Sequence, residues 1–280
     1  MMSMKRAISI LTTVICIMAC NKAEVPGGGN QLSAVATIDT QTKTVYTDDG
    51  VNAGMKVEWA DADSFTAYYE GTKTLTFTKS EAGNTFSATV VPEGLTTSTQ
   101  FTGLYGSAAT LSGSGAITID FSKQNGSLNN VAAYDVMTSA SVLTDGVLSF
   151  AFKHKCAIIR LAVKSNDSSY KTAVKKVELN FLDSSISSDF ATTSGFTINN
   201  STGYSSVTFT LAESIPYGQT KTVYCVIPAI SYNKTNYSNI GNVKDYVASK
   251  DINTPQAGIL AGKVYDASVE YKGAVITNPE

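Results

Sequence analysis

The feature that most constrains the fold of this chain is a two-residue alternation of apolar and polar side chains in short, scattered segments. It is found in segments 75–77, 86–90, 117–121, 177–181 and 207–211. Successive side chains of a β-strand point to opposite faces, so each segment is predicted to be a half-buried strand. No segment after residue 30 shows a sustained helical stripe. The pattern predicts an all-β chain built as sandwiches or barrels.

One hairpin and one long strand stand out. Asp145-Gly146 separates two apolar runs, which is a strong signal for a tight hairpin. Beyond it, Leu148, Phe150, Phe152 and His154 fall on one face of a strand. The apolar residues from 157 to 163 continue the strand one position out of phase. We therefore expect a β-bulge near Lys155-Cys156, since one inserted residue swaps the faces.

The N-terminus reads as an export signal followed by a lipid attachment site. Two basic residues precede an apolar run from Ala7 to Met18, which is too short to span a bilayer, and then comes Ala19-Cys20. We predict a lipoprotein signal peptide over residues 1–19 and lipidation of Cys20, which holds the protein on a membrane by several acyl chains. Residues 20–30 contain three consecutive glycines and are predicted to form a flexible tether.

A polar stretch after Lys164 marks the expected domain boundary. The sequence predicts an N-terminal β-sandwich over residues 31–165 and a C-terminal β-sandwich over residues 166–280. Each part is long enough to bury a core of its own.

Composition excludes several classes of function. The 280 residues carry a formal net charge of -2, which becomes -4 once Lys5 and Arg6 leave with the signal peptide. No basic cluster is present, so we expect no nucleic-acid partner. The single histidine rules out multi-histidine metal sites, and there is no CxxC pair. Asp61 and Asp63 fit a solvated turn better than a calcium loop. We expect no catalytic residues, no cofactor and no metal.

Three potentially reactive side chains fall in apolar strands, where a core role and a chemical role are both conceivable. His154 follows Phe150 and Phe152 and is predicted to be a structural, hydrogen-bonded core histidine. Cys156 and Cys225 are the cysteines left after lipidation. In an exported protein they could pair as a disulfide, or each could act as a small buried apolar residue. The sequence leaves these two alternatives open.

Four pieces of the chain together resemble the fimbrillin family of Bacteroidetes, the lipoprotein-derived major and minor pilus subunits. They are the lipidation site at Cys20 with its polar tether, the segment Trp59-Ala60-Asp61, the strand from Leu148 to Leu161 with His154 in it, and the closing segments 226–228 and 261–265. Each piece is short, but their order and spacing cover nearly the whole mature chain.

The resemblance implies two transthyretin-like β-sandwich domains in tandem and a mode of assembly. A precursor exported as a lipoprotein reaches the cell surface, where an Arg-specific protease removes the lipid and the first strand. A C-terminal strand of another subunit then fills the open groove by strand addition. In this chain, Leu32 to Ile38 is the candidate first strand. The candidate donor strand is Ala274, Val275, Ile276 and Thr277, which could equally be the last strand of its own domain.

This chain departs from the family pattern at the processing site. No arginine lies between residues 30 and 60, and Arg160 is the one arginine left after the signal peptide. Lys43 is the nearest candidate for processing and Lys56 the second. Either the protease accepts lysine, or the subunit keeps its lipid.

The predicted function is therefore that of a fimbrial structural or adhesive subunit on the cell outer membrane or cell surface. Its expected partners are other fimbrial subunits, outer-membrane lipid through Cys20, and host or bacterial surface ligands. The alternative is a surface-anchored glycan-binding lipoprotein. A glycan binder that uses exposed tryptophans is not favoured, because Trp59 is the one tryptophan and falls in a core pattern. The sequence leaves open whether the subunit forms the stalk, the tip or the anchor.

Overall fold

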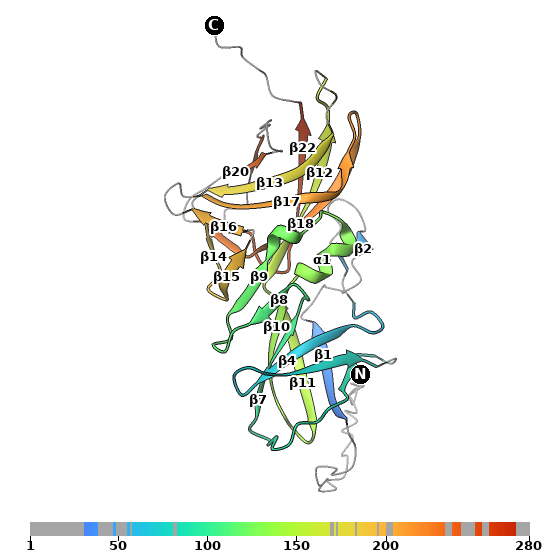
Figure 1. Cartoon of the computed structure of the whole chain (residues 1–280), viewed down its shortest axis with the longest axis vertical. Helices are drawn as coiled ribbons and strands as arrows, with labels where there is room; N and C mark the ends of the chain where they lie inside the picture. The colour runs from blue at the N-terminus through green and yellow to red at the C-terminus, as the bar shows by residue number, and fades with distance from the viewer. Residues whose placement is uncertain are drawn as a thin grey trace, which may run out of the picture.

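A computed structural model of the chain shows the arrangement of its strands (Figure 1). It describes residues 31–38, 47–48, 55–56, 58–80, 83–168, 171, 173–182, 184–194, 196–199, 204–232, 237–241, 250–253 and 258–272. Cys20, Lys43 and the candidate donor residues 274–277 lie outside these ranges. Within them almost all regular secondary structure is β-strand, which confirms the all-β prediction.

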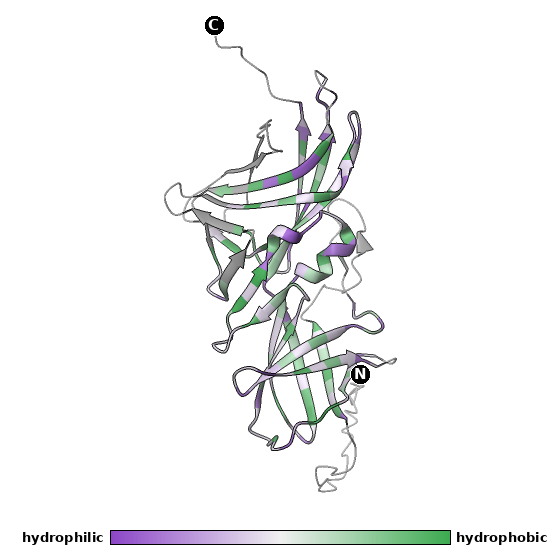
Figure 2. Ribbon diagram, in the orientation of Figure 1, coloured by the Kyte–Doolittle hydropathy of each residue, from purple (hydrophilic) through white to green (hydrophobic). Residues whose placement is uncertain are grey.

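Seven strands close into a barrel at one end of the molecule (Figure 1). Their order around the barrel is β1-β11-β10-β7-β4-β5-β6. The strands are β1 Leu32–Ile38, β4 Ser64–Tyr69, β5 Lys73–Lys79, β6 Thr85–Ala88, β7 Gln100–Tyr105, β10 Met137–Val142 and β11 Val147–His154. Buried and exposed residues alternate along β1, β5 and β11, as the two-residue pattern predicts. Figure 2 shows the resulting change between apolar and polar positions along the barrel strands.

The hairpin predicted at Asp145-Gly146 is present. Both residues have positive φ, 50° and 78°, and Thr144 and Val147 exchange backbone hydrogen bonds of 3.0 and 2.9 Å across the turn. Positive φ at both central residues is the geometry that tight hairpins need, and Asp-Gly supplies it at low cost. The turn joins β10 to β11.

A second group of sheets forms the other end of the molecule. One sheet has the order β18-β12-β22 and a second has the order β16-β17-β13-β20-β21. The first consists of β12 Cys156–Ser165, β18 Thr220–Pro228 and β22 Val264–Tyr271. The second consists of β13 Val174–Leu182, β16 Phe196–Asn199, β17 Tyr204–Ile215, β20 Tyr237–Gly241 and β21 Lys250–Asn253.

Smaller elements complete the described chain. They are the pair β2 Thr47–Asp48 and β3 Met55–Lys56, the pair β14 Ser184–Ile186 and β19 Ile230–Tyr232, and the sheet of β8 Ala109–Leu111, β9 Ile117–Asp120 and β15 Phe190–Ser194. A 3-10 turn, η1 Phe121–Lys123, and a short helix, α1 Leu128–Tyr134, follow β9. The sequence did not predict the helix, because α1 buries two residues in seven, too few for a helical stripe.

The prediction of one long, bulged strand from Leu148 to Val163 is wrong. The segment is two strands in two different sheets, β11 in the barrel and β12 between β18 and β22, with Lys155 between them. The face predicted for Leu148, Phe150 and Phe152 is buried as expected. The change of phase arises because β12 is buried on both faces from Cys156 to Leu161, and not because a residue is inserted into a continuous ladder.

Two hydrophobic clusters divide the described residues. One fills the barrel, and the other joins the C-terminal sheets. The second cluster also takes in residues from β8, β9, η1 and α1, such as Leu111, Ile119, Phe121 and Val131. It includes all of the buried apolar residues of β12 as well. The second cluster therefore draws on residues before and after β10 and β11, so the two clusters are not two consecutive stretches of sequence.

Candidate subunit interface

Strand β1 is the one strand that closes the barrel between β6 and β11. It pairs in parallel with β11 from Ser33↔Val147 to Ile38↔Phe152, and antiparallel with β6 from Leu32↔Ala88 to Val35↔Thr85. Among the described strands, β6 and β11 have no pairing with each other. Removing β1 would therefore leave two unpaired strand edges facing one another across one strand's width.

The inward side chains of β1 are small. Leu32, Ala34 and Ala36 are buried in the barrel core, while Ser33, Val35 and Thr37 face outward. Because alanine side chains bury little apolar surface, β1 is bound mainly through its backbone hydrogen bonds to β6 and β11. A different strand with small or medium apolar residues at alternate positions would meet the same pockets.

Trp59 lies in the barrel core and contacts β1. Its indole Nε1 donates a buried hydrogen bond of 3.0 Å to the carbonyl oxygen of Ala36. The ring packs edge-on against Phe86, Tyr105 and Phe152 at centroid distances of 5.1, 5.4 and 5.6 Å. The sequence predicted Trp59 as a core residue. Its bond to the backbone of β1 is a contact that the sequence did not reveal.

The last described strand, β22, belongs to the three-stranded sheet β18-β12-β22. It runs parallel to β12, with Arg160 opposite Asp266. Arg160 is 4% exposed in its side chain and binds the Asp266 carboxylate with two nitrogens, Nε at 2.5 Å and Nη2 at 2.9 Å. A two-pronged ion pair of this kind fixes register as well as adding energy. The candidate donor residues 274–277 come after β22 in the sequence and lie outside the described residues.

Lys56, the second candidate for proteolytic processing, is the last residue of β3, where it pairs with Thr47. A cut after Lys56 would remove β1, β2 and β3 together. Lys43 and the lipidation residue Cys20 lie outside the described residues, as does the donor segment, so their roles stay predictions.

His154 is a buried side chain that is hydrogen-bonded to one partner. Its side chain is 5% exposed, and Nδ1 lies 2.8 Å from Oδ2 and 2.9 Å from Oδ1 of Asp135, at the C-terminal end of α1. Burial lowers the pKa of His154, but the charge and hydrogen bond of Asp135 outweigh burial and raise that pKa above its ordinary value. His154 Nε2 has no hydrogen-bond partner among the described residues. The pair ties the end of β11 to α1.

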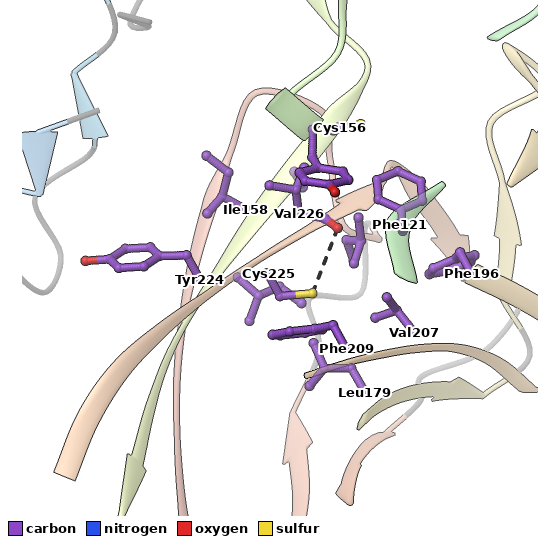
Figure 3. Close-up of a cluster of buried hydrophobic side chains, with 14 of the residues drawn as sticks. Phe121, Cys156, Ile158, Leu179, Phe196, Val207, Phe209, Tyr224, Cys225 and Val226 are labelled. Atoms are coloured by element: carbon purple, nitrogen blue, oxygen red, sulfur yellow. Dashed lines mark hydrogen bonds between the residues drawn. The ribbon is translucent and has the colours of Figure 1, made fainter. Parts of the chain in front are cut away.

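Cys156 and Cys225 are both free and buried (Figure 3). They lie on neighbouring strands but out of register, because Cys225 faces Ile159 and Cys156 faces Pro228. Burial raises the pKa of both thiols, and the charge of Asp135 raises that of Cys156 further. Cys156, His154 and Asp135 are residue types of a nucleophilic triad, but an enclosed thiol with a raised pKa has little thiolate to attack with. These cysteines act as small apolar core residues.

A buried glutamine is a second polar contact that the sequence did not reveal. Gln124 Nε2 donates to the carbonyl oxygens of Phe121 and Val226, and its Oε1 accepts from the backbone of Val226 at 2.7 Å. The side chain thereby joins η1 to β18 across more than a hundred residues of sequence. No local pattern identifies such a residue, since its partners are backbone groups of a distant strand.

Two further features of the described residues concern metals and membranes. No group of three or more histidine, cysteine or acidic residues there could hold a metal ion. No helix in those ranges has the length and apolar character that crossing a membrane requires.

No protein-family model matches the chain, and no curated protein matches it. Among solved structures, it is similar to a "putative cell adhesion protein" of Bacteroides ovatus, with 16% identity and a TM-score of 0.48 over 86% of this chain and 91% of that one. It is also similar to a fimbrial protein of Bacteroides ovatus (12% identity, TM-score 0.33, 88% of this chain and 51% of that one). The minor pilin of Streptococcus agalactiae matches at 9% identity and a TM-score of 0.28, over 90% of this chain and 98% of that one. These names belong to the class that the sequence resemblance indicates. At such scores the likenesses carry no functional conclusion, which must come from the chain's own residues.

Proposed function

We propose that this protein is a structural or adhesive subunit of a cell-surface fimbrium, exported as a lipoprotein through Cys20 and joined to neighbouring subunits by strand addition at the position of β1. The observation that carries the proposal is that β1 alone closes the barrel, with small inward side chains and a ladder on each edge. A strand held in this way can be exchanged for another without rebuilding the rest of the core.

The tandem, transthyretin-like architecture belongs to this proposal. Two separate hydrophobic clusters support two units, and the boundary after residue 165 stays part of the proposal. The donor is the segment after β22, because the ion pair of Arg160 with Asp266 keeps β22 itself in its sheet. The partners are other copies or relatives of this subunit, and the location is the outer membrane surface.

Releasing β1 in a controlled way tests strand addition. We would insert a cleavage site for a sequence-specific protease into segment 39–46 of the mature chain and replace Ser33 and Ser87 with cysteine. These residues face each other across the β1–β6 ladder, at a separation suited to a disulfide. The oxidised protein keeps β1 after cleavage, and the reduced protein can release it, so one protein serves as its own control.

The expected result is that the cleaved, reduced protein binds a synthetic peptide of residues 272–280 and forms multimers in light scattering. The cleaved, oxidised protein should do neither. Strand addition at β1 is wrong if both redox forms bind the peptide equally, or if the reduced form releases β1 and still binds no peptide.

A further inference from the structure

We propose that an open groove beside the barrel binds a short, neutral oligosaccharide. The groove encloses about 530 Å³ and lies between the β4–β5 turn, the loop before β7 and the β8–β9 turn. Its lining includes the polar side chains of Tyr68, Thr96, Ser98, Gln100, Ser112 and Ser114. The volume falls in the range of ordinary small-ligand sites. The inference goes beyond subunit assembly and does not depend on it, since no residue of β1 lines the groove.

Hydroxyl groups face the groove from both of its walls. On one wall, Thr96 Oγ1 lies 2.9 Å from Ser98 Oγ and 3.3 Å from Thr99 Oγ1. On the other, Ser112 Oγ lies 2.8 Å from Ser114 Oγ. A hydroxyl has one donor and two acceptor sites. Thr96 Oγ1 and Ser112 Oγ also accept from the backbone N–H groups of Ser98 and Ala116, at 3.4 and 3.2 Å, so the bonding capacity left for a ligand lies mainly on Ser98 and Ser114. Gln100 adds an amide that is exposed and can both donate and accept.

The groove is electrically balanced. Its one charged lining residue is Glu70, which is bound by Lys73 at 2.6 Å. No cationic side chain among the lining residues could hold a phosphate, sulfate or carboxylate, and the described residues offer no metal cluster there. The matching ligand is uncharged and rich in hydroxyl groups, which is the chemistry of a neutral sugar.

Tyr68 gives the groove a partly exposed aromatic ring, whereas Tyr69 is 8% exposed and belongs to the barrel core. Tyr68 is half-buried, and its hydroxyl accepts a hydrogen bond of 3.4 Å from the backbone of Leu111, which ties β4 to β8. Tyr69 packs against Phe101 at a centroid distance of 5.3 Å. A tyrosine combines an apolar ring with a polar tip, and a sugar likewise has an apolar C–H face and a polar rim. The site is therefore built for both sides of the ligand.

A peptide is a poorer match for this groove. Strand β4 pairs with β5 and β7, and β7 pairs with β4 and β10, so these two strands are occupied on both edges. Strand β8 ends its sheet among the described strands, but it is only three residues long. Strand addition needs a free edge and apolar pockets at alternate positions. The groove offers hydroxyl groups in place of such pockets.

The test is saturation-transfer difference NMR on the mature, uncleaved chain with Cys20→Ser. The probes are maltotriose, cellotriose, xylotriose and chitotriose, with 3′-sialyllactose as an anionic counterpart. Using the uncleaved chain keeps the result separate from strand addition, because β1 stays in place. We expect at least one neutral trisaccharide to bind and the sialylated sugar to bind more weakly.

Two variants locate the site. Gln100→Ala removes the exposed amide and should weaken binding about tenfold, the effect of one lost hydrogen-bonding group. Gly113→Leu places a side chain at the β8–β9 turn, where an added Cβ meets only Thr72 Cγ2, at 3.8 Å, and it should narrow the groove without backbone strain. Thr110→Ala, an exposed change on β8 outside the groove, should leave binding unchanged.

Three results would each overturn the inference. One is the absence of binding by the wild-type chain to every neutral trisaccharide at millimolar concentration. Another is binding that neither Gln100→Ala nor Gly113→Leu reduces more than Thr110→Ala does. The third is preferred binding of 3′-sialyllactose, because no cationic side chain lines the groove and the neighbouring Lys73 is paired with Glu70.

Discussion

At the scale of single residues, the pair of His154 and Asp135 is the most consequential polar contact of the described chain. Both side chains are almost completely buried, at 5% and 2% exposure, so removing one leaves the other without its charged partner in the core. We expect His154→Ala to lower the free energy of unfolding by about 3–5 kcal/mol, as for other broken buried pairs. Chemical denaturation at pH 6 measures this, with the exposed Lys153→Ala on the same strand as control. An equal effect of the two variants would contradict the role assigned to His154.

The same pair gives the protein a pH-dependent stability with a definite sign. Because the folded-state pKa of His154 is raised, protonation favours folding. Its contribution is fully present below the unfolded pKa of about 6.5, and it is lost as pH rises through the raised folded value. Wild-type protein should therefore lose stability relative to His154→Gln on going from pH 6 toward pH 8. A difference between the two proteins that does not change with pH would contradict this.

The residue scale also shows what the sequence could predict about the core. The burial of Phe150 and Phe152 and the structural role of His154 follow from their positions in an alternating strand. The partner of His154 does not, because Asp135 is one of 23 acidic residues and only the fold brings it near. Gln124 was missed for the same reason, since it bonds the backbone of a strand about a hundred residues away.

At the scale of elements, the ion pair between Arg160 and Asp266 should decide how firmly β22 is held. Arg160→Ala removes both prongs, so we expect the amides of β22 to exchange hydrogen at least about tenfold faster, the equivalent of one lost charged hydrogen bond. Hydrogen-exchange mass spectrometry reads this directly, with β11 as an internal reference. Arg160→Lys should protect β22 only in part, because lysine cannot bind the carboxylate in the same two-pronged way. Equal acceleration of β11 and β22 would mean general destabilisation and not a local clamp.

The alternating sequence pattern predicts individual strands but not the sheets in which they pair. Five alternating segments were correctly identified as strands, and the Asp145-Gly146 turn was correctly placed. The pattern could not show that β11 and β12 enter different sheets, because a strand's partners are set by distant segments such as β18 and β22. A phase change that looks like a bulge in one strand is in fact the passage between two cores.

At the scale of the whole molecule, two cores meet at Lys155. Its backbone N–H donates to the carbonyl oxygen of Val136, and its carbonyl oxygen accepts from Ala229, so the connection is bonded on both sides. The segment from β8 to α1 lies between barrel strands in sequence but packs in the second core. That arrangement depends on contacts far apart in sequence, which no local pattern reveals.

The state of the N-terminus decides how the whole molecule is used. Arg160, the one arginine after residue 6, is buried and bound to Asp266, so an Arg-specific protease finds no accessible arginine in the described part of the folded protein. Under the proposed function, processing after Lys43 would free β1, whereas an unprocessed chain would keep β1 and the proposed lipid. We predict that the wild-type protein from its native surface begins at Thr44, and that Lys43→Ala instead carries the acylated Cys20. Intact mass and N-terminal sequencing distinguish these chains, with Lys56→Ala as the matched control.

A wild-type chain that itself begins at an acylated Cys20, or an unchanged mature mass in Lys43→Ala, would contradict processing at Lys43. The acylated wild-type result would make the protein a permanently anchored subunit, one that offers its C-terminal segment to others but accepts none at β1.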